Sequence, residues 1–103
     1  MAKDFRYQEL FEAYKSMLTE RQAQIFKEYY ELDLSFAEIA EEKGTTRQSV
    51  SDALKKARAE LDALEARLGV CAKQRAVLDV AERLRQNEQT QAFAKELDSI
   101  FGE

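Results

Sequence analysis

The stretch that decides the fold is residues 35–58, which read SFAEIAEEKGTTRQSVSDALKKAR. Ile39 and Val50 stand five residues before and six residues after Gly44, the positions of the apolar pair that locks two helices of a helix-turn-helix together. Ala40 leaves room where the two helices meet, and Gly44 supplies a permissive backbone for the turn between them. Because these constrained positions agree, the stretch predicts a helix-turn-helix.

Capping residues mark where the helices begin. Thr46 is the expected N-cap of the second helix of the motif. Upstream, Thr19 with Gln22 and Ser35 with Glu38 each form the pattern of a capping box. The predicted helices cover about 4–17, 20–32, 36–43, 47–68 and 72–86, with a break at about 87–90 and a short sixth helix after it.

The helix that starts at Arg47 continues well past the motif. Its apolar residues follow spacings of 4, 3, 4, 3 and 4, an a/d seam that predicts a helix of about 22 residues and about 33 Å. The seam is Val50, Leu54, Ala57, Leu61, Leu64 and Leu68. Its distal leucines need a cover, either the later helices of the same chain or a second copy. We expect a two-fold homodimer that uses this helix and the C-terminal helices.

The other predicted helices carry apolar stripes at three- and four-residue spacings. With no proline, three glycines and no alternating pattern, the chain predicts an all-α fold. Its 103 residues fit one helical domain, with a core at about 5–68 and a helical extension at about 69–103. The stripes are Phe5, Leu10, Phe11, Tyr14 and Leu18; Ile25, Phe26, Tyr29 and Leu32; Val77, Val80, Ala81 and Leu84; and Phe93, Leu97, Ile100 and Phe101.

The composition excludes several classes of function. With no histidine and one cysteine, Cys71, the chain cannot form the usual Cys/His zinc site, an internal disulfide or a histidine-dependent catalytic site. No P-loop or dinucleotide-binding glycine motif occurs, so we expect no enzyme activity and no cofactor. No apolar run approaches the ~20 residues of a membrane span, and no signal peptide is visible. We expect a cytoplasmic protein without membrane insertion.

Charge is distributed unevenly along the chain. The formal net charge is -4, which by itself argues against nucleic acid. Residues 1–42 carry a net -5 and residues 59–103 a net -3, whereas residues 43–58 carry a net +4. The basic segment contains the second helix of the motif. This partition favours contact with a polyanion over an ordinary solvated face.

In a helix-turn-helix the first turns of the second helix face the major groove. Arg47 and Gln48 suit bidentate contacts to purines, while Lys56 and Arg58 suit phosphate. The tyrosines at 7, 14, 29 and 30 could stack on exposed bases, but packing between the first two helices is the expected role. The candidate nucleic-acid-binding residues are Thr46, Arg47, Gln48, Ser51, Asp52, Lys55, Lys56 and Arg58.

The segment 14–58, YKSMLTERQAQIFKEYYELDLSFAEIAEEKGTTRQSVSDALKKAR, resembles the YlxM family of bacterial helix-turn-helix proteins. Its helix-turn-helix is also similar to region 4 of sigma factors, which reads promoter DNA. The resemblance to YlxM implies an all-helical protein whose gene neighbours those of the signal recognition particle pathway, with a regulatory or accessory role there. The chain has no other sigma region, so promoter recognition within a holoenzyme is not expected.

Two functions therefore remain open. In the first, the protein is a nucleic-acid-binding regulator whose basic helix contacts DNA or the RNA of the signal recognition particle. In the second, the helix-turn-helix is a scaffold, and acidic surfaces of residues 1–42 bind a signal recognition particle protein.

Overall fold

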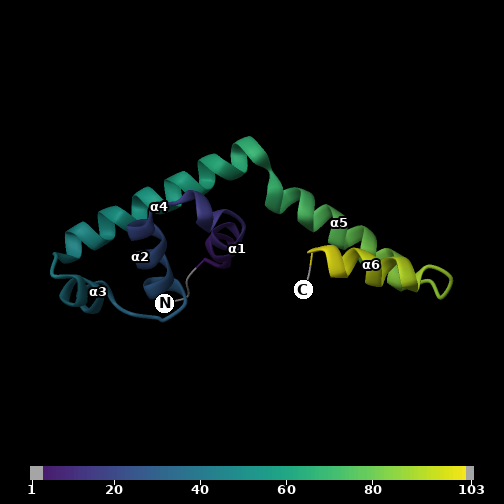
Figure 1. Ribbon diagram of the computed structural model, residues 1–103, viewed down its shortest axis with the longest axis horizontal. Coiled ribbons are helices and arrows are strands. Elements are labelled where there is room, and N and C mark those ends of the chain that lie inside the picture. Colours follow the sequence, from purple (N-terminus) through teal and green to yellow (C-terminus); the bar gives the residue numbers. More distant parts are fainter. Residues whose placement is uncertain (1–3, 102–103) are drawn as a thin grey trace. The chain divides into compact units, whose positions relative to one another are not determined.

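The computed structural model describes residues 4–101, and of Phe101 the backbone alone. This range forms six α-helices and one short 3₁₀ helix and contains no strand, so the all-α prediction is confirmed. The chain divides into two compact units, Met1–Leu68 and Gly69–Glu103. In chain order the elements are α1 (Phe5–Tyr14), η1 (Lys15–Met17), α2 (Glu20–Tyr30), α3 (Phe36–Lys43), α4 (Arg47–Leu68), α5 (Val70–Arg85) and α6 (Gln91–Phe101) (Figure 1).

Two complete capping boxes start α2 and α3, as predicted. The Thr19 hydroxyl accepts a hydrogen bond from the Gln22 backbone N–H at 3.1 Å, and the Gln22 side chain accepts one from the Thr19 N–H at 3.1 Å. Ser35 and Glu38 exchange the equivalent bonds. Because the Ser35 N–H and hydroxyl stabilise the charged carboxylate, the pKa of Glu38 lies below its usual value.

The ends of the first two helices differ from the prediction. The first helix is α-helical only to Tyr14 and tightens into η1 for its last turn. α2 ends at Tyr30 because the chain turns at Asp33, whose φ of 58° no helix can contain. Leu32, which lies beyond the end of α2, is 57% exposed, and Phe5, the first residue of α1, is 80% exposed, so neither contributes to the buried stripe predicted for its helix.

The core of the N-terminal unit lies where α4 meets α1, α2 and α3. Aromatic rings of α1 and α2 stack on one another, with centroids 4.5 Å apart for Phe11 and Phe26 and 4.2 Å apart for Phe26 and Tyr30. The largest apolar side chains that are almost completely buried in this unit are Tyr14, Phe26, Ile25, Ile39, Leu54, Leu61 and Val50.

α1 covers Leu61 and Leu64 of the α4 seam, whereas Leu68, the last residue of the predicted seam, is 42% exposed. Leu61 and Leu64 are buried, and two tyrosine hydroxyls of α1 bind the carboxylates that directly follow these leucines in α4. These bonds run from Tyr7 to Asp62 at 2.8 Å and from Tyr14 to Glu65 at 2.6 Å. The expectation that Leu61 and Leu64 need a second copy or the C-terminal helices is therefore wrong. The prediction of a homodimer remains, but it must depend on another surface.

The turn between α3 and α4 has the geometry that the sequence required. Gly44 adopts φ 65° and ψ 38°, its N–H bonds the Glu41 carbonyl, and the Thr45 N–H bonds the Ala40 carbonyl at 2.9 Å. This pattern is a Schellman motif, which satisfies the last carbonyls of α3. Ala40 is buried at the crossing, so the close approach predicted there is confirmed.

Substitution of Gly44 tests the importance of this turn. A Cβ at Gly44 would meet no atom within 4 Å, so the cost of Gly44→Ala is confined to the backbone conformation. We expect a loss of about 1–2 kcal/mol of unfolding free energy, the cost of an L-residue in the left-handed region. Chemical denaturation measures it. As a matched change, Ala37→Gly at an exposed position of α3 should cost less unfolding free energy, about 0.5–1 kcal/mol.

The C-terminal unit is a hairpin of α5 and α6, which run antiparallel (Figure 1). α5 begins at Val70, two residues before the predicted start, because Gly69 turns the chain with φ 61°. The predicted break is present, and the Thr90 hydroxyl closes it with a 2.7 Å hydrogen bond to the Leu84 carbonyl.

Val80 is 41% exposed and so does not share the buried face of Ala81, although the predicted stripe required this. The side chain of Phe101 lies outside the described residues.

Candidate nucleic-acid interface

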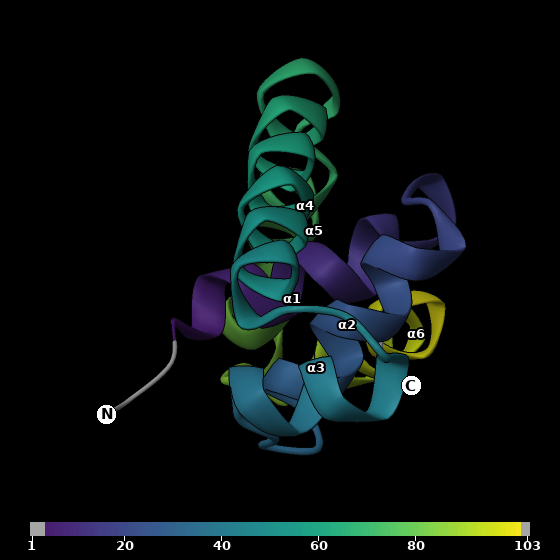
Figure 2. The ribbon, with the colours of Figure 1, turned by 90° about the vertical axis from the view of Figure 1, so that its left-hand side faces the viewer.

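An N-cap hydrogen bond and a buried apolar pair fix the orientation of the first turns of α4. The Thr46 hydroxyl accepts a hydrogen bond from the Ser49 N–H at 3.0 Å, which confirms Thr46 as the N-cap. Ile39 of α3 and Val50 of α4 are both fully buried, as the sequence predicted for the pair that joins the two helices. Figure 2 views the N-terminal unit from the end at which α3 and these first turns of α4 lie.

Most of the candidate residues lie on the outer face of α4. Ser51 and Arg58 are half-buried, and the other six are exposed. The exposed residues are Thr46, Arg47, Gln48, Asp52, Lys55 and Lys56. The structure therefore leaves six of the eight predicted side chains accessible at the start of α4.

Two cations of the basic segment have partners inside the protein. The Lys43 Nζ lies 3.1 Å from the Glu28 Oε1, and both side chains are largely buried. The Arg58 Nε donates a 2.9 Å hydrogen bond to the Tyr30 hydroxyl, with the guanidinium 5.8 Å from the centre of that ring. Arg58 thus fastens α4 to α2, and it is not a freely available phosphate contact.

The remaining three cations, Arg47, Lys55 and Lys56, form neither an ion pair nor a hydrogen bond within the described part of the chain. All three are exposed on α4. We call these residues the cationic face. Side chains of this length and freedom can reach phosphate oxygens, and Arg47 can also form a bidentate contact to a base.

Asp52, the one acidic residue in this segment, is engaged by its neighbour. The Gln48 Nε2 donates a hydrogen bond to the Asp52 Oδ1 at 2.9 Å, one turn along the helix. This bond orients the Gln48 amide and leaves its carbonyl oxygen directed away from the carboxylate. Asp52, which the sequence placed among the candidate binding residues, therefore supports the Gln48 side chain.

The structure adds a residue that sequence reasoning missed. Arg21 of α2 donates a hydrogen bond from Nη2 to the Ser49 Oγ at 3.0 Å and borders a groove of about 560 Å³ between α2 and α4. The sequence does contain a signal for this position of Arg21. Arg21 stands one turn before the core residue Ile25 and so lies near the side of α2 that meets α4. The groove is lined by Arg21, Gln22, Thr46, Gln48, Ser49, Asp52, Ala53 and Lys56.

The tyrosines have mainly packing roles, as expected. Tyr14 and Tyr30 are buried, and Tyr7 is half-buried with its hydroxyl bound to Asp62. Tyr29 is also half-buried, but it borders a hollow of about 410 Å³ next to Arg47. Tyr29 is therefore the tyrosine that borders the surface beside Arg47.

The described residues also bear on metal binding, disulfide formation and membrane spanning. Among residues 4–101, no group of three or more histidine, cysteine or acidic residues could hold a metal ion. Cys71 is buried and forms no disulfide. No helix in the same range combines the length and the apolar character needed to cross a membrane.

Comparison with known proteins agrees with this architecture. Residues 1–100 match the family described as "Putative helix-turn-helix protein, YlxM / p13 like" (UPF0122). The UPF0122 protein of Halalkalibacterium halodurans is 37% identical over 99 residues, which cover 96% of this chain and 91% of the relative. The UPF0122 protein of Mycoplasma mycoides is 32% identical over 102 residues, or 98% and 90% of the two chains. That of Desulforamulus reducens is 48% identical over 60 residues, or 58% and 51%.

Proposed function

Because the chain belongs to the UPF0122 family of YlxM / p13-like helix-turn-helix proteins, we propose that it is a non-enzymatic nucleic-acid-binding regulator. In this proposal the first turns of α4 enter the major groove of duplex DNA. The regulated process is the signal recognition particle pathway, which the resemblance to YlxM implies.

The cationic face is the observation that carries the proposal. Internal partners engage Lys43 and Arg58, whereas the exposed cations of α4 have none in the described part of the chain. Ion pairs between exposed side chains contribute little to stability. Exposed cations that neutralise phosphates, in contrast, release the counterions bound to the nucleic acid, and this release favours binding. A set of accessible cations on a helix held rigidly by α2 and α3 therefore suits a polyanion.

Duplex DNA fits this helix better than duplex RNA does. The major groove of B-DNA, about 12 Å wide, admits an α-helix. The corresponding groove of A-form RNA is deep and too narrow for side-chain readout. Because α4 presents its readers from a regular helix, and only Tyr29 among the tyrosines borders the surface beside Arg47, we favour DNA over an RNA loop.

Titration of the full chain with duplex DNA and with signal recognition particle RNA, each at several salt concentrations, tests the proposal. We expect DNA to bind more tightly, with log K falling by about 3 units per decade of salt for three phosphate contacts. The net charge of -4 predicts modest affinity without long-range attraction. Tighter binding to the RNA would redirect the proposal to that partner, and a flat salt response for both would reject it.

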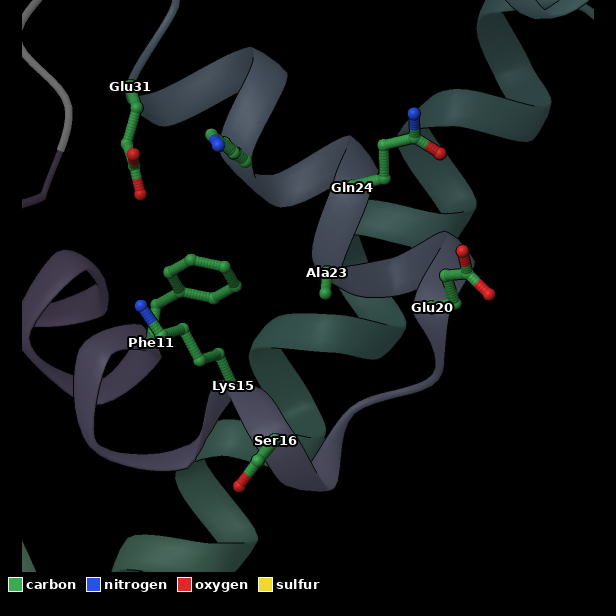
Figure 3. Close-up of a pocket in the computed structure, with 8 residues that line it drawn as sticks. Phe11, Lys15, Ser16, Glu20, Ala23, Gln24 and Glu31 are labelled. Atoms are coloured by element: carbon green, nitrogen blue, oxygen red, sulfur yellow. The ribbon is translucent and has the colours of Figure 1, made fainter.

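The second candidate function is that of a protein adaptor, and one feature favours it. A pocket of about 430 Å³ lies between the α1–η1 segment and α2, as Figure 3 shows. Phe11 faces its interior, while Lys15, Glu20 and Glu31 stand around it. An apolar floor with charges of both signs suits a side chain of a partner protein. Binding of a purified signal recognition particle protein in the absence of nucleic acid, weakened by Ala23→Glu, would favour this function.

A further inference from the structure

The hairpin of α5 and α6 has almost no interior of its own. Among its described residues, the buried side chains are Cys71, Ala81 and Ala94. Two alanines and one cysteine remove little apolar surface from water. Units of fewer than about 40 residues usually need a disulfide, a metal ion or association with another chain. This unit spans residues 69–103 and falls in that class.

Large apolar side chains lie on its outside instead. Val80 is 41% exposed, Phe93 is 58% exposed and Ile100 is 67% exposed. Spacings of three and four residues join them to half-buried neighbours on the same helices. We call this set the hairpin face. It consists of Val77, Val80 and Leu84 on α5, with Phe93, Leu97 and Ile100 on α6.

The two halves of the hairpin face lie on the same side. Val80 precedes the buried Ala81 by one residue, and Phe93 precedes the buried Ala94 by one residue. One residue is about 100° of helical rotation. In two antiparallel helices that meet through their alanines, one step back along each chain turns in opposite senses when both helices are viewed from the same end, so both stripes come to one side of the hairpin. The result is an apolar surface two helices wide.

The two intramolecular means of supporting so small a unit are excluded. The chain has one cysteine, so the hairpin cannot contain a disulfide. Residues 69–101 hold no metal-binding group among those the structure describes. Association with a further protein surface remains. Every molecule of the protein carries this hairpin, so each needs a protein surface that packs on its hairpin face. A second copy of the chain is always present in the same amount and supplies such a surface.

We infer that the hairpin face is the interface of a homodimer, in which two hairpins form an antiparallel four-helix bundle. A two-fold interface brings identical patches together, and a flat apolar surface is complementary to itself. With the two-fold axis along the bundle, α5 of one copy lies beside α6 of the other. Arg83, which pairs with Asp79 of its own helix at 3.4 Å, stands one turn after Val80, and Glu96 lies between Phe93 and Ile100, so the bundle would bring Arg83 of one copy to the same rim as Glu96 of the other.

Sedimentation equilibrium of the full chain tests this inference independently of nucleic acid. Wild-type protein should be dimeric at micromolar concentration, and Phe93→Glu/Ile100→Glu should be monomeric. The matched control Met17→Glu/Leu32→Glu places the same charges on apolar residues of similar exposure, 56% and 57%, in the N-terminal unit. It should remain dimeric. A monomeric wild type, a dimeric hairpin variant or dissociation of the control would each overturn the inference.

A milder variant covers the case in which the charged hairpin does not fold. Phe93→Ala keeps the helix-forming character of α6 and removes only the ring. We expect its dimer dissociation constant to rise roughly tenfold or more, with circular dichroism unchanged in the concentrated, dimeric state. The midpoint of thermal unfolding of wild type should also rise with protein concentration, as for any fold coupled to association. An unchanged dissociation constant would show that Phe93 lies outside the interface.

Discussion

Replacement of Arg47, Lys55 and Lys56 together by alanine should lower affinity for duplex DNA by about 100-fold or more at low salt. Each phosphate contact that is lost removes about 0.9 from the slope of log K against log salt. We therefore expect the slope to fall in magnitude by two to three units. The three side chains are exposed and lie outside the core, so unfolding free energy should change by less than about 1 kcal/mol. Fluorescence anisotropy at several salt concentrations measures both quantities.

The control for this variant must separate local contact from general repulsion. Lys15, Lys27 and Arg67 are also exposed in the N-terminal unit and lie away from the outer face of the first turns of α4. Their triple replacement by alanine makes the same change in net charge. If binding is local, the control should retain most of the affinity and nearly all of the salt slope. Equal losses in the two variants would show that overall charge, and not the cationic face, governs binding.

Arg58 provides a sharper test, because sequence and structure disagree about it. The sequence places Arg58 among the phosphate contacts, whereas the structure binds its Nε to the Tyr30 hydroxyl. Arg58→Ala should therefore cost about 1–2 kcal/mol of stability through the lost hydrogen bond. It should leave the salt slope near that of wild type. A fall in slope of about one unit would return Arg58 to the interface.

The sequence was informative where a single local interaction decides the structure. The capping boxes at Thr19 and Ser35, the left-handed Gly44 and the pairing of Ile39 with Val50 each depend on residues close together in the chain. The signals for such features are residue type and spacing, both of which a sequence displays. Helix existence and the position of the motif could be predicted for the same reason.

The sequence was less informative where the partner is distant. The α4 seam predicted that Leu61 and Leu64 would be buried, but it could not identify α1 as the cover. Periodicity gives the buried face of a helix and not the element that buries it. Likewise, a count of cations could not show that Lys43 meets Glu28 across α2 and α3. The structure therefore leaves fewer cations available for phosphate contacts than the sequence suggested.

Loss of that buried ion pair should have the largest effect on stability. Glu28 is 6% exposed, and its Oε1 accepts no hydrogen bond of regular geometry from the described residues, so the Lys43 charge is what compensates it. Lys43→Met keeps the aliphatic stem and leaves a buried carboxylate unpaired. We expect a loss of about 3–5 kcal/mol of unfolding free energy at neutral pH. Lys27→Met, on the exposed side of α2, should change it by less than about 0.5 kcal/mol.

The stability deficit of the same variant, relative to wild type, should become smaller as the pH falls. The hydrogen bond with Glu28 raises the pKa of Glu42, and the negative charge of Glu28 raises it further. The positive charge of Lys43 lowers the same pKa. Removal of Lys43 therefore raises the pKa of Glu42 further above its unfolded value. A folded state that binds more protons is favoured below the unfolded pKa, and this advantage is lost as pH increases through the folded pKa. Urea unfolding of Lys43→Met at pH 4 and pH 7 should show the smaller deficit, relative to wild type, at pH 4.

A double variant distinguishes loss of a pair from loss of packing. In Glu28→Gln/Lys43→Met no charge remains buried at this position, so we expect most of the stability to return and the added pH dependence to disappear. Continued instability of the double variant would mean that Lys43 contributes mainly through its packed aliphatic chain. A deficit below about 1 kcal/mol in Lys43→Met would mean that water reaches Glu28 and replaces the lysine. In that case Lys43 could join Arg47, Lys55 and Lys56 in binding nucleic acid, and its own removal should then reduce the salt slope by about one unit.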